Sequence, residues 1–288
     1  MASVSRPSSC SIHCRASVLL ILAGADIRIA LGIEYDGTGY NGWQRQRAGL
    51  GVQQRLEEAL AKVANEAVEV VCAGRTDTGV HASGQVVHFD TSSERSRRGW
   101  LLGTNSGLPD DISVTWVQPV ADDFHARYSA TARSYRYRIL NRLQRSALYR
   151  HRAWWVYQTL DANAMDEASR YLLGRHDFSA FRAAGCQAVT AVRDIAHIGV
   201  ERDRDWITLS VTANAFLQHM VRNIAGTLVA VGLGEHNVEW VREVLLRRDR
   251  KTGGIAAPPH GLTLVSVDYP EHFAIPESVG YGGSATGC

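Results

Sequence analysis

Apolar and polar residues alternate over residues 27–35, and this two-residue period predicts a half-buried β-strand. Residues 51–65 instead gather their apolar side chains at helical spacing, which predicts an amphipathic helix. Further apolar runs predict strands near 67–73, 85–90 and 112–118 and a helix near 95–105. The order strand–helix–strand–strand–helix–strand is that of a split βαβ, ferredoxin-like unit.

The second half of the chain repeats this pattern loosely. On its first strand Arg133, Tyr135, Tyr137 and Ile139 share one face, because alternate residues of a strand point the same way. Residues 161–173 are read as a helix with Asp161 as its N-cap. The other expected elements are strands near 153–157, 191–200, 205–212 and 262–267 and helices over 216–231 and 238–247.

Two similar halves indicate an internal duplication. The fold class is therefore α+β, with two ferredoxin-like halves whose antiparallel sheets form a central cleft, the usual place for a site. We expect an N-terminal domain over residues 27–125 and a C-terminal domain over 126–270. Residues 271–288 are rich in Gly and Ser and are read as a flexible tail.

Residues 1–26 differ in composition from the rest of the chain. They are Ser-rich, contain no acid before Asp26, and include an apolar stretch over 18–25 that is too short to span a bilayer. This stretch resembles the apolar region of a signal peptide. We favour instead a disordered or mis-started leader, with the folded chain beginning near Ile27.

Composition sets broad limits on the function. The chain has 288 residues, 45% hydrophobic and 21% charged, as in soluble globular proteins. Its formal net charge of +2 does not by itself indicate a nucleic-acid partner. The five cysteines show neither a disulfide framework nor zinc-ligand spacing, which favours a reducing compartment and hence a cytoplasmic protein.

Positive charge is concentrated in one part of the sequence. Residues 124–160 contain no acid but eight arginines: Arg127, Arg133, Arg136, Arg138, Arg142, Arg145, Arg150 and Arg152. Such a run is most often a solvated face. It is also large enough to contact a polyanion.

The first candidate site is the glycine-punctuated loop over residues 73–81. Asp77 is the only acid between Glu69 and Asp90, and Arg75 stands two positions before it. A carboxylate beside a guanidinium suits a nucleophile or a general base, whereas the alternative is an Asx-turn with a structural arginine.

A second glycine-rich segment invites a different interpretation. Gly37, Gly39 and Gly42 form a G-x-G-x-x-G pattern after a strand. We reject a dinucleotide site, because no apolar helix opens directly after Gly42.

Two residues of the second half could complete a site. Arg222 lies in the apolar segment 216–231 and needs an anionic partner or a route to water; if this helix borders the cleft, Asp77 is its natural partner. Tyr135 could stack on a base, the alternative being a core tyrosine, which is our interpretation for Tyr137.

Taken together, these segments resemble those of a known family. The chain resembles the TruA family of tRNA pseudouridine synthases from about residue 27 to 270. The matching segments include GWQRQ at 42–46, AGRTD at 73–77, ARSYRY at 132–137, DFSAF at 177–181 and HMVRN at 219–223. Thr78 departs from the family, which usually has Ala there.

The resemblance implies a specific activity and partner. It implies a homodimer with an RRM-like duplicated fold and without cofactor, metal or membrane, which isomerises uridines at tRNA positions 38, 39 and 40 in the anticodon stem-loop. By position, Asp77 is the catalytic carboxylate, Arg222 its partner, and Tyr135 the residue that packs on the target base. Arg75 matches an arginine that helps to open the stem. Two alternatives remain: a non-catalytic RNA-binding module and a glycosidase that releases the base.

Overall fold

The computed structural model describes residues 26–276. The expected leader lies outside these residues except for Asp26, and so does the expected tail from residue 277 on. The first residues after Pro270 form a 3-10 helix, Glu271–Phe273, whose Phe273 is buried with its ring 5.2 Å from that of Phe124. The packed chain therefore continues past residue 270.

Each element expected from the hydrophobic pattern is present. In the first half these are β1 Ile27–Tyr35, α1 Val52–Ala64, β2 Val71–Cys72, β3 His81–Thr91, α2 Arg97–Gly107 and β4 Ile112–Val120. In the second half these are β5 Ala132–Asn141, β6 Trp154–Val156, α3 Ala162–Ser169, β8 Val192–Asp203, β9 Trp206–Ala213, α4 Met220–Gly232, α5 Trp240–Arg247 and β10 Leu262–Asp268. The chain is thus a mixed α+β protein, as its pattern predicts.

The strands form one continuous sheet that runs through both halves of the chain. The order of this ten-stranded sheet is β4-β1-β3-β10-β5-β9-β8-β7, with β2 also paired to β3 and β6 to β5. The late strand β10 joins the two halves: it runs antiparallel to β5 and parallel to β3, where Thr263 lies opposite His81. Strand periodicity predicts which face of β10 is buried but does not identify its neighbours.

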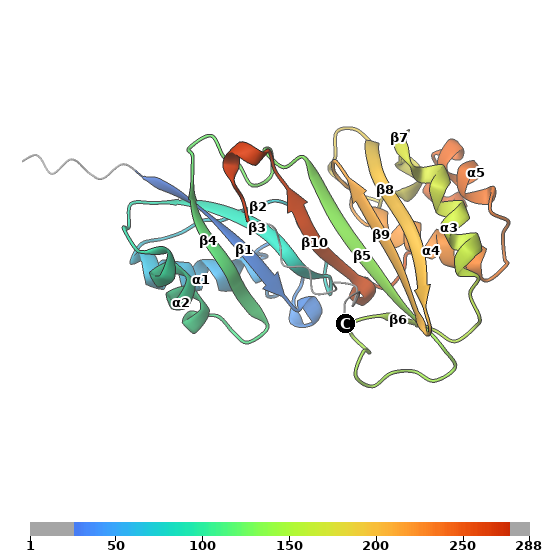
Figure 1. Ribbon diagram of the computed structural model, residues 1–288, viewed down its shortest axis with the longest axis horizontal. Coiled ribbons are helices and arrows are strands. Elements are labelled where there is room, and N and C mark those ends of the chain that lie inside the picture. The colour runs from blue at the N-terminus through green and yellow to red at the C-terminus, as the bar shows by residue number, and fades with distance from the viewer. Residues whose placement is uncertain (1–25, 277–288) are drawn as a thin grey trace, which may run out of the picture.

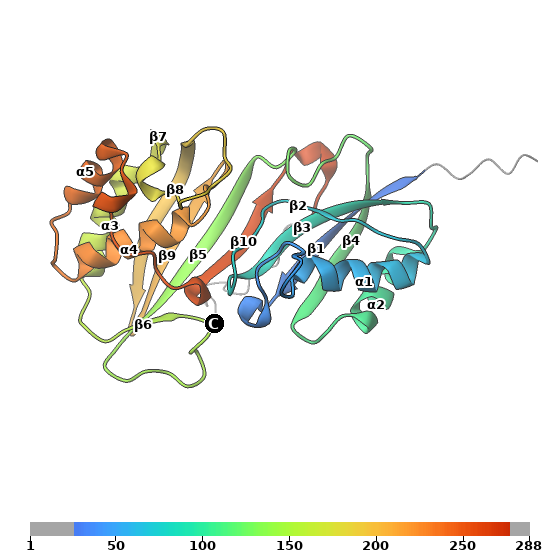
Figure 2. The same cartoon turned by 180° about the vertical axis from the view of Figure 1, so that it is seen from behind.

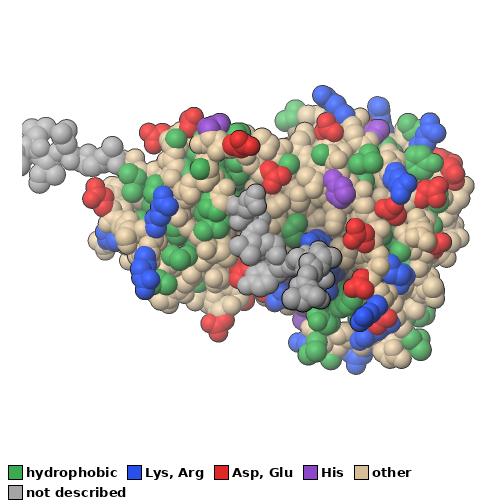
Figure 3. All heavy atoms as spheres, in the orientation of Figure 1, with side chains coloured by type: hydrophobic (Ala, Val, Ile, Leu, Met, Phe, Trp, Pro, Cys, Tyr) green, Lys and Arg blue, Asp and Glu red, His purple; other side chains and the backbone are tan. Residues whose placement is uncertain are grey.

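The helices all lie on one face of this sheet (Figures 1 and 2). Seen from behind, α1 and α2 cover the first half, while α3, α4 and α5 cover the second (Figure 2). Between the two groups of helices run β10 and β5. On the opposite face, acidic and basic side chains are interspersed (Figure 3).

The faces predicted for β5 are confirmed. Arg133, Tyr135, Tyr137 and Ile139 are buried, and the residues between them are partly exposed. Helix α4 packs against these residues and is buried on nearly every side. At Gly226 a Cβ atom would stand 1.7 Å from a backbone carbonyl oxygen of the segment 253–257, so that segment lies directly on α4.

Several element boundaries differ from the predicted ones. Strand β3 begins at His81 rather than near 85, and α4 begins at Met220 rather than 216 because His219 adopts a left-handed backbone conformation (φ 61°). The short polar strand β7 (Gly174–Asp177) was not predicted. Asp161 is the N-cap of α3, as predicted: its carboxylate accepts from the N–H groups of Asn163 and Ala164.

Candidate active site

Asp77 lies on the loop between β2 and β3, and this loop is anchored to the first half. The N–H of Trp43 donates to the carbonyl of Thr76 (3.0 Å), and the Thr76 hydroxyl is 2.8 Å from the Tyr35 hydroxyl. Gly42 has φ +91°, and a Cβ there would stand 2.6 Å from the Thr76 carbonyl oxygen. The segment with the G-x-G-x-x-G pattern therefore supports the Asp77 loop by close backbone contact.

The partners of Asp77 come from the other half of the chain. Its Oδ2 lies 3.8 Å from Nη1 of Arg222 and 3.5 Å from Nε2 of His219, both at the start of α4. Nε of Arg222 donates to the carbonyl of Ala257 (2.8 Å), and the N–H of Ala257 donates to the carbonyl of Arg222 (3.0 Å). The guanidinium is thus oriented by segment 253–257 before it meets the carboxylate.

Electrostatic attraction at the start of α4 favours a negative group there. The N-terminus of a helix carries partial positive charge, and the Arg222 guanidinium adds a full one. Burial lowers the pKa of His219; Asp77 opposes this shift, while Arg222 and Arg250 reinforce it. His219 is therefore a neutral imidazole at pH 7, and Arg222 supplies the permanent charge beside Asp77.

Tyr135 lies against the same loop. Its side chain is buried and meets the ring of Phe216 edge-on at 4.9 Å, and a Cβ at Gly74 would stand 3.8 Å from its hydroxyl. Burial and the Asp77 charge raise the pKa of Tyr135, so the hydroxyl keeps its proton. Tyr137 is a core residue, as predicted: it is buried and its hydroxyl donates to the carbonyl of Pro258 (2.7 Å).

Arg75 is not the partner of Asp77, although it is the nearest basic residue in sequence. Its side chain is exposed and makes no hydrogen bond or ion pair within residues 26–276. Arg222 rather than Arg75 lies at ion-pair distance from the carboxylate. The guanidinium of Arg75 remains available to solvent.

Sequence reasoning missed the contribution of His219. The residue is three positions before Arg222, a spacing that places two side chains on one face where a helix begins. That spacing was the available signal, but the left-handed backbone that aims the imidazole at Asp77 cannot be read from it.

The arginine run does not form one continuous surface. Arg133 is buried and donates to four backbone carbonyls, those of Ala73, Arg127, Ala130 and Asn214. Arg138 lies over the ring of Trp206 (4.1 Å), and Arg152 pairs with Asp36 (2.7 Å). Part of the run therefore holds the fold together, and the exposed remainder is available to a polyanion.

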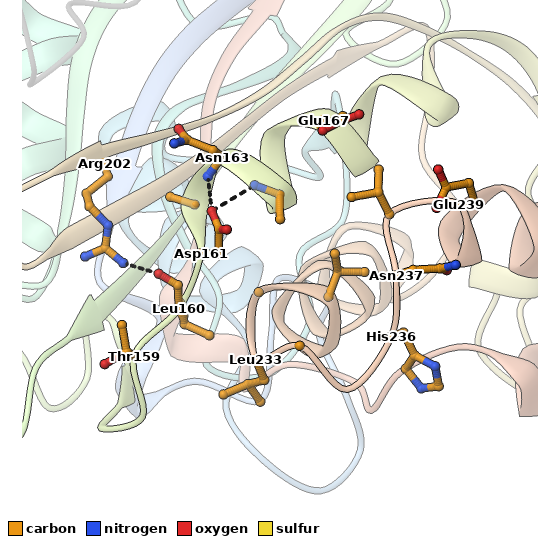
Figure 4. Close-up of a pocket in the computed structure, with 16 residues that line it drawn as sticks. Thr159, Leu160, Asp161, Asn163, Glu167, Arg202, Leu233, His236, Asn237 and Glu239 are labelled. Atoms are coloured by element: carbon orange, nitrogen blue, oxygen red, sulfur yellow. Dashed lines mark hydrogen bonds between the residues drawn. The ribbon is translucent and has the colours of Figure 1, made fainter.

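A cavity of about 800 Å³ lies elsewhere, in the second half (Figure 4). It is lined by the start of α3 and the connection from α4 to α5, and Arg202 at its side donates to the carbonyl of Leu160 (2.8 Å). None of the candidate site residues lines it.

Residues 26–276 lack two further features. They contain no group of three or more His, Cys, Asp and Glu side chains placed to hold a metal ion. In the same part of the chain, no helix is both long and apolar enough to cross a membrane.

A carboxylate beside a fixed guanidinium, held between two parts of one sheet, defines a site for nucleophilic or acid–base chemistry. Comparison with known proteins identifies the family. A model described as tRNA pseudouridine synthase matches residues 32–129 and 168–270. The chain is 58% identical to tRNA pseudouridine synthase A of Pseudoalteromonas atlantica over 251 residues, which is 87% of this chain and 95% of that protein.

Other relatives match to a similar extent. The protein of the same name from Colwellia psychrerythraea is 53% identical over 252 residues, 88% of this chain and 97% of that protein. The one from Nitrosococcus oceani is 53% identical over 250 residues, 87% and 96% of the two chains. The chain belongs to the tRNA pseudouridine synthase family, as the sequence motifs predicted, and is therefore an isomerase.

Proposed function

We propose that this enzyme converts uridine to pseudouridine at positions 38, 39 and 40 in the anticodon stem-loop of tRNA, with Asp77 as the essential carboxylate. The observation that carries the proposal is the meeting of Asp77 with Arg222 and His219 from the opposite half. The Asp77 carboxylate is part-exposed, and its partners come from the other half of the chain. It is therefore placed to act on a substrate that lies between the two halves.

The proposed reaction uses these side chains directly. The bond between uracil N1 and ribose C1′ breaks, the base turns, C5 bonds to C1′, and the C5 proton is replaced by one at N1. Asp77 acts on the ribose or the base, and the Arg222 guanidinium keeps the carboxylate in place. Tyr135 packs on the detached uracil so that it does not leave. The atoms balance within one nucleotide, so the proposed isomerisation requires no cofactor.

The target uridine must first leave the stack of bases, which costs a few kcal/mol. We propose that the exposed Arg75 helps to hold the stem open, and that the exposed arginines of residues 124–160 contact its phosphates. Both roles are supported by exposure: Arg75, Arg127, Arg145 and Arg150 all reach solvent.

The proposal extends to the domains, the oligomeric state and the location of the enzyme. The matched segments 32–129 and 168–270 fall one in each half, which supports two ferredoxin-like or RRM-like halves with a catalytic cleft between their helices. We propose the domain limits 27–125 and 126–270, a homodimer, and a cytoplasmic location for the enzyme.

Substitution of Asp77 tests the function. Asp77→Asn should abolish pseudouridine formation while tRNA binding persists, because the amide fills the same space but carries no charge. Unmodified tRNA is incubated with each protein, and pseudouridine is mapped by carbodiimide-dependent primer-extension stops. The control is Asp110→Asn, an exposed acid of the same half. Turnover above a few per cent in Asp77→Asn, or release of free uracil by the unaltered enzyme, contradicts the proposal.

A further inference from the structure

Arg250 is a half-buried cation beside the candidate site that the reaction above does not use. It lies on the 3-10 helix Arg250–Thr252, and its Nη2 donates to Oδ1 of Asn223 (3.0 Å). Within residues 26–276 no carboxylate lies at ion-pair distance from it. A partly desolvated guanidinium without an anionic partner loses hydration and gains little in return.

The guanidinium is held in one orientation by a buried amide. Asn223 is buried, and its Nδ2 donates to the carbonyl of Phe181 (2.8 Å), which leaves Oδ1 to accept from Arg250. The backbone N–H of Asn223 donates to the carbonyl of His219 (2.9 Å). The same turn of α4 therefore positions Arg250 and both partners of Asp77.

Two guanidiniums and one carboxylate act on the His219 imidazole at this turn. Asp77 is the carboxylate in contact with Arg222 and His219, whereas two guanidiniums, those of Arg222 and Arg250, both lower the pKa of the His219 imidazole. One guanidinium balances Asp77, and the other is left over. An anion brought by the substrate would balance it.

We propose that Arg250, oriented by Asn223, binds a backbone phosphate of the RNA next to the target uridine. This inference rests on the proposed function, because it takes its ligand from the RNA substrate. A guanidinium suits a phosphodiester because its planar array of N–H groups can donate two hydrogen bonds to one phosphate. Such a contact would fix the nucleotide's backbone while the base is turned.

Kinetics of three variants with unmodified tRNA test the charge. Arg250→Gln should raise KM about tenfold and change kcat by less than about twofold, because a phosphate contact made equally in ground and transition states contributes to binding. The slope of log affinity against log salt should fall by about 0.7–0.9. Arg250→Lys should keep most of that slope. The matched control is Arg247→Gln, which removes an exposed arginine that pairs with Glu243 (3.5 Å).

The phosphate itself is located with anticodon stem-loop RNAs that carry one neutral methylphosphonate at a time. Each of these RNAs also carries a 2′-O-methyl group beside the methylphosphonate. The binding of each RNA is therefore compared with that of an RNA that bears the 2′-O-methyl group alone. At one linkage beside the target uridine, the unaltered enzyme should lose about tenfold in affinity, whereas Arg250→Gln should lose nothing further. Equal losses in both proteins at every linkage would overturn the inference.

The two proposals fail in different ways. If the unaltered enzyme forms no pseudouridine in tRNA, the proposed function is wrong. If it does, but Arg250→Gln keeps the KM and salt slope of the unaltered enzyme, the function stands and the phosphate contact is wrong.

Discussion

The carboxylate of Asp77 is flanked by two nitrogen groups of unlike character, a permanent cation at Arg222 and a neutral imidazole at His219. His219 also has a left-handed backbone, which costs a residue with a Cβ about 1–2 kcal/mol. Strain of this kind persists only where the surrounding structure enforces it, and it is concentrated at functional sites. We therefore expect His219 to position Asp77.

The role of His219 predicts a pair of contrasting variants. His219→Gly and His219→Ala both remove the imidazole, but only Ala keeps the backbone strain, so the Ala variant should be about 1 kcal/mol less stable in urea unfolding. Both substitutions should lower kcat.

The titration of His219 predicts a pH dependence. As pH falls below about 6.5, protonation of His219 should reduce the kcat/KM of the unaltered enzyme. Because the pKa of His219 is lowered in the folded protein, the decline in kcat/KM should begin below pH 6.5. The decline should be absent in His219→Gly.

A buried histidine on β3 predicts acid sensitivity of the fold. His88 on β3 accepts from the N–H of Ala126, and burial lowers its pKa to about 4. Between pH 6.5 and 4 the unfolded chain binds a proton that the folded chain does not. The free energy of unfolding should therefore fall by an amount on the order of 1–3 kcal/mol as pH drops through this window.

The variant His88→Asn isolates that contribution, because its Oδ1 can still accept from Ala126 and does not titrate. Urea unfolding at pH 7 and pH 4.5 should show a smaller loss of stability in His88→Asn than in the unaltered protein. Equal losses would assign the acid sensitivity to other groups.

At this scale, the sequence indicated Asp77 as a candidate residue but did not predict its surroundings. An isolated acid in a glycine-punctuated loop is visible in the sequence, and so is an arginine in an apolar helix. The sequence does not determine that Arg75 points to solvent, or that a left-handed residue aims an imidazole at Asp77, because both depend on local backbone geometry.

Among the elements, α4 links the core to the site. Its start supplies His219 and Arg222, and its middle is pressed against segment 253–257, which in turn orients Arg222 through Ala257. Apolar spacing predicted this helix, but not that its first expected turn, residues 216–219, is loop. The N-terminus of α4 is consequently exposed to Asp77.

Two glycines of α4 predict how this packing acts on the site. In Gly226→Ala the Cβ would meet a backbone carbonyl at 1.7 Å, so segment 253–257 must move, at a cost of about 1–3 kcal/mol and with a loss of kcat. In the control Gly232→Ala, the atom nearest to the new Cβ belongs to the flexible Met165 side chain, at 2.7 Å. The effects on stability and on kcat should therefore be small. Urea unfolding and single-turnover rates measure the two effects. Similar losses in both variants would contradict this account.

For the whole molecule, β10 is the strand that makes one sheet out of two halves. It lies between β3 and β5, and Leu264 at its middle is fully buried. Its alternation was predictable, but its neighbours were not, since pairing between distant segments is set by the packing of the complete chain.

A single sheet predicts a single unfolding transition. Tryptophans report on both halves, for example Trp100 in the first and Trp206 in the second. Leu264→Ala should lower the free energy of unfolding by about 2–5 kcal/mol. It should shift the unfolding midpoints reported by the fluorescence of the two tryptophans by the same amount. Each tryptophan is followed in a protein in which the other tryptophans are replaced. Separate midpoints for the two halves would show that β10 does not couple them.

The lateness of β10 in chain order also sets when the enzyme can work. A nascent chain that has left the ribosome as far as residue 261 already carries Asp77, Tyr135, Arg222 and Arg250, yet the place between β3 and β5 is still vacant. Synthesis must reach the bridging strand before the carboxylate and its distant arginine can be brought into register. We therefore expect a message truncated shortly before that point to encode every proposed site residue and still yield an inactive protein.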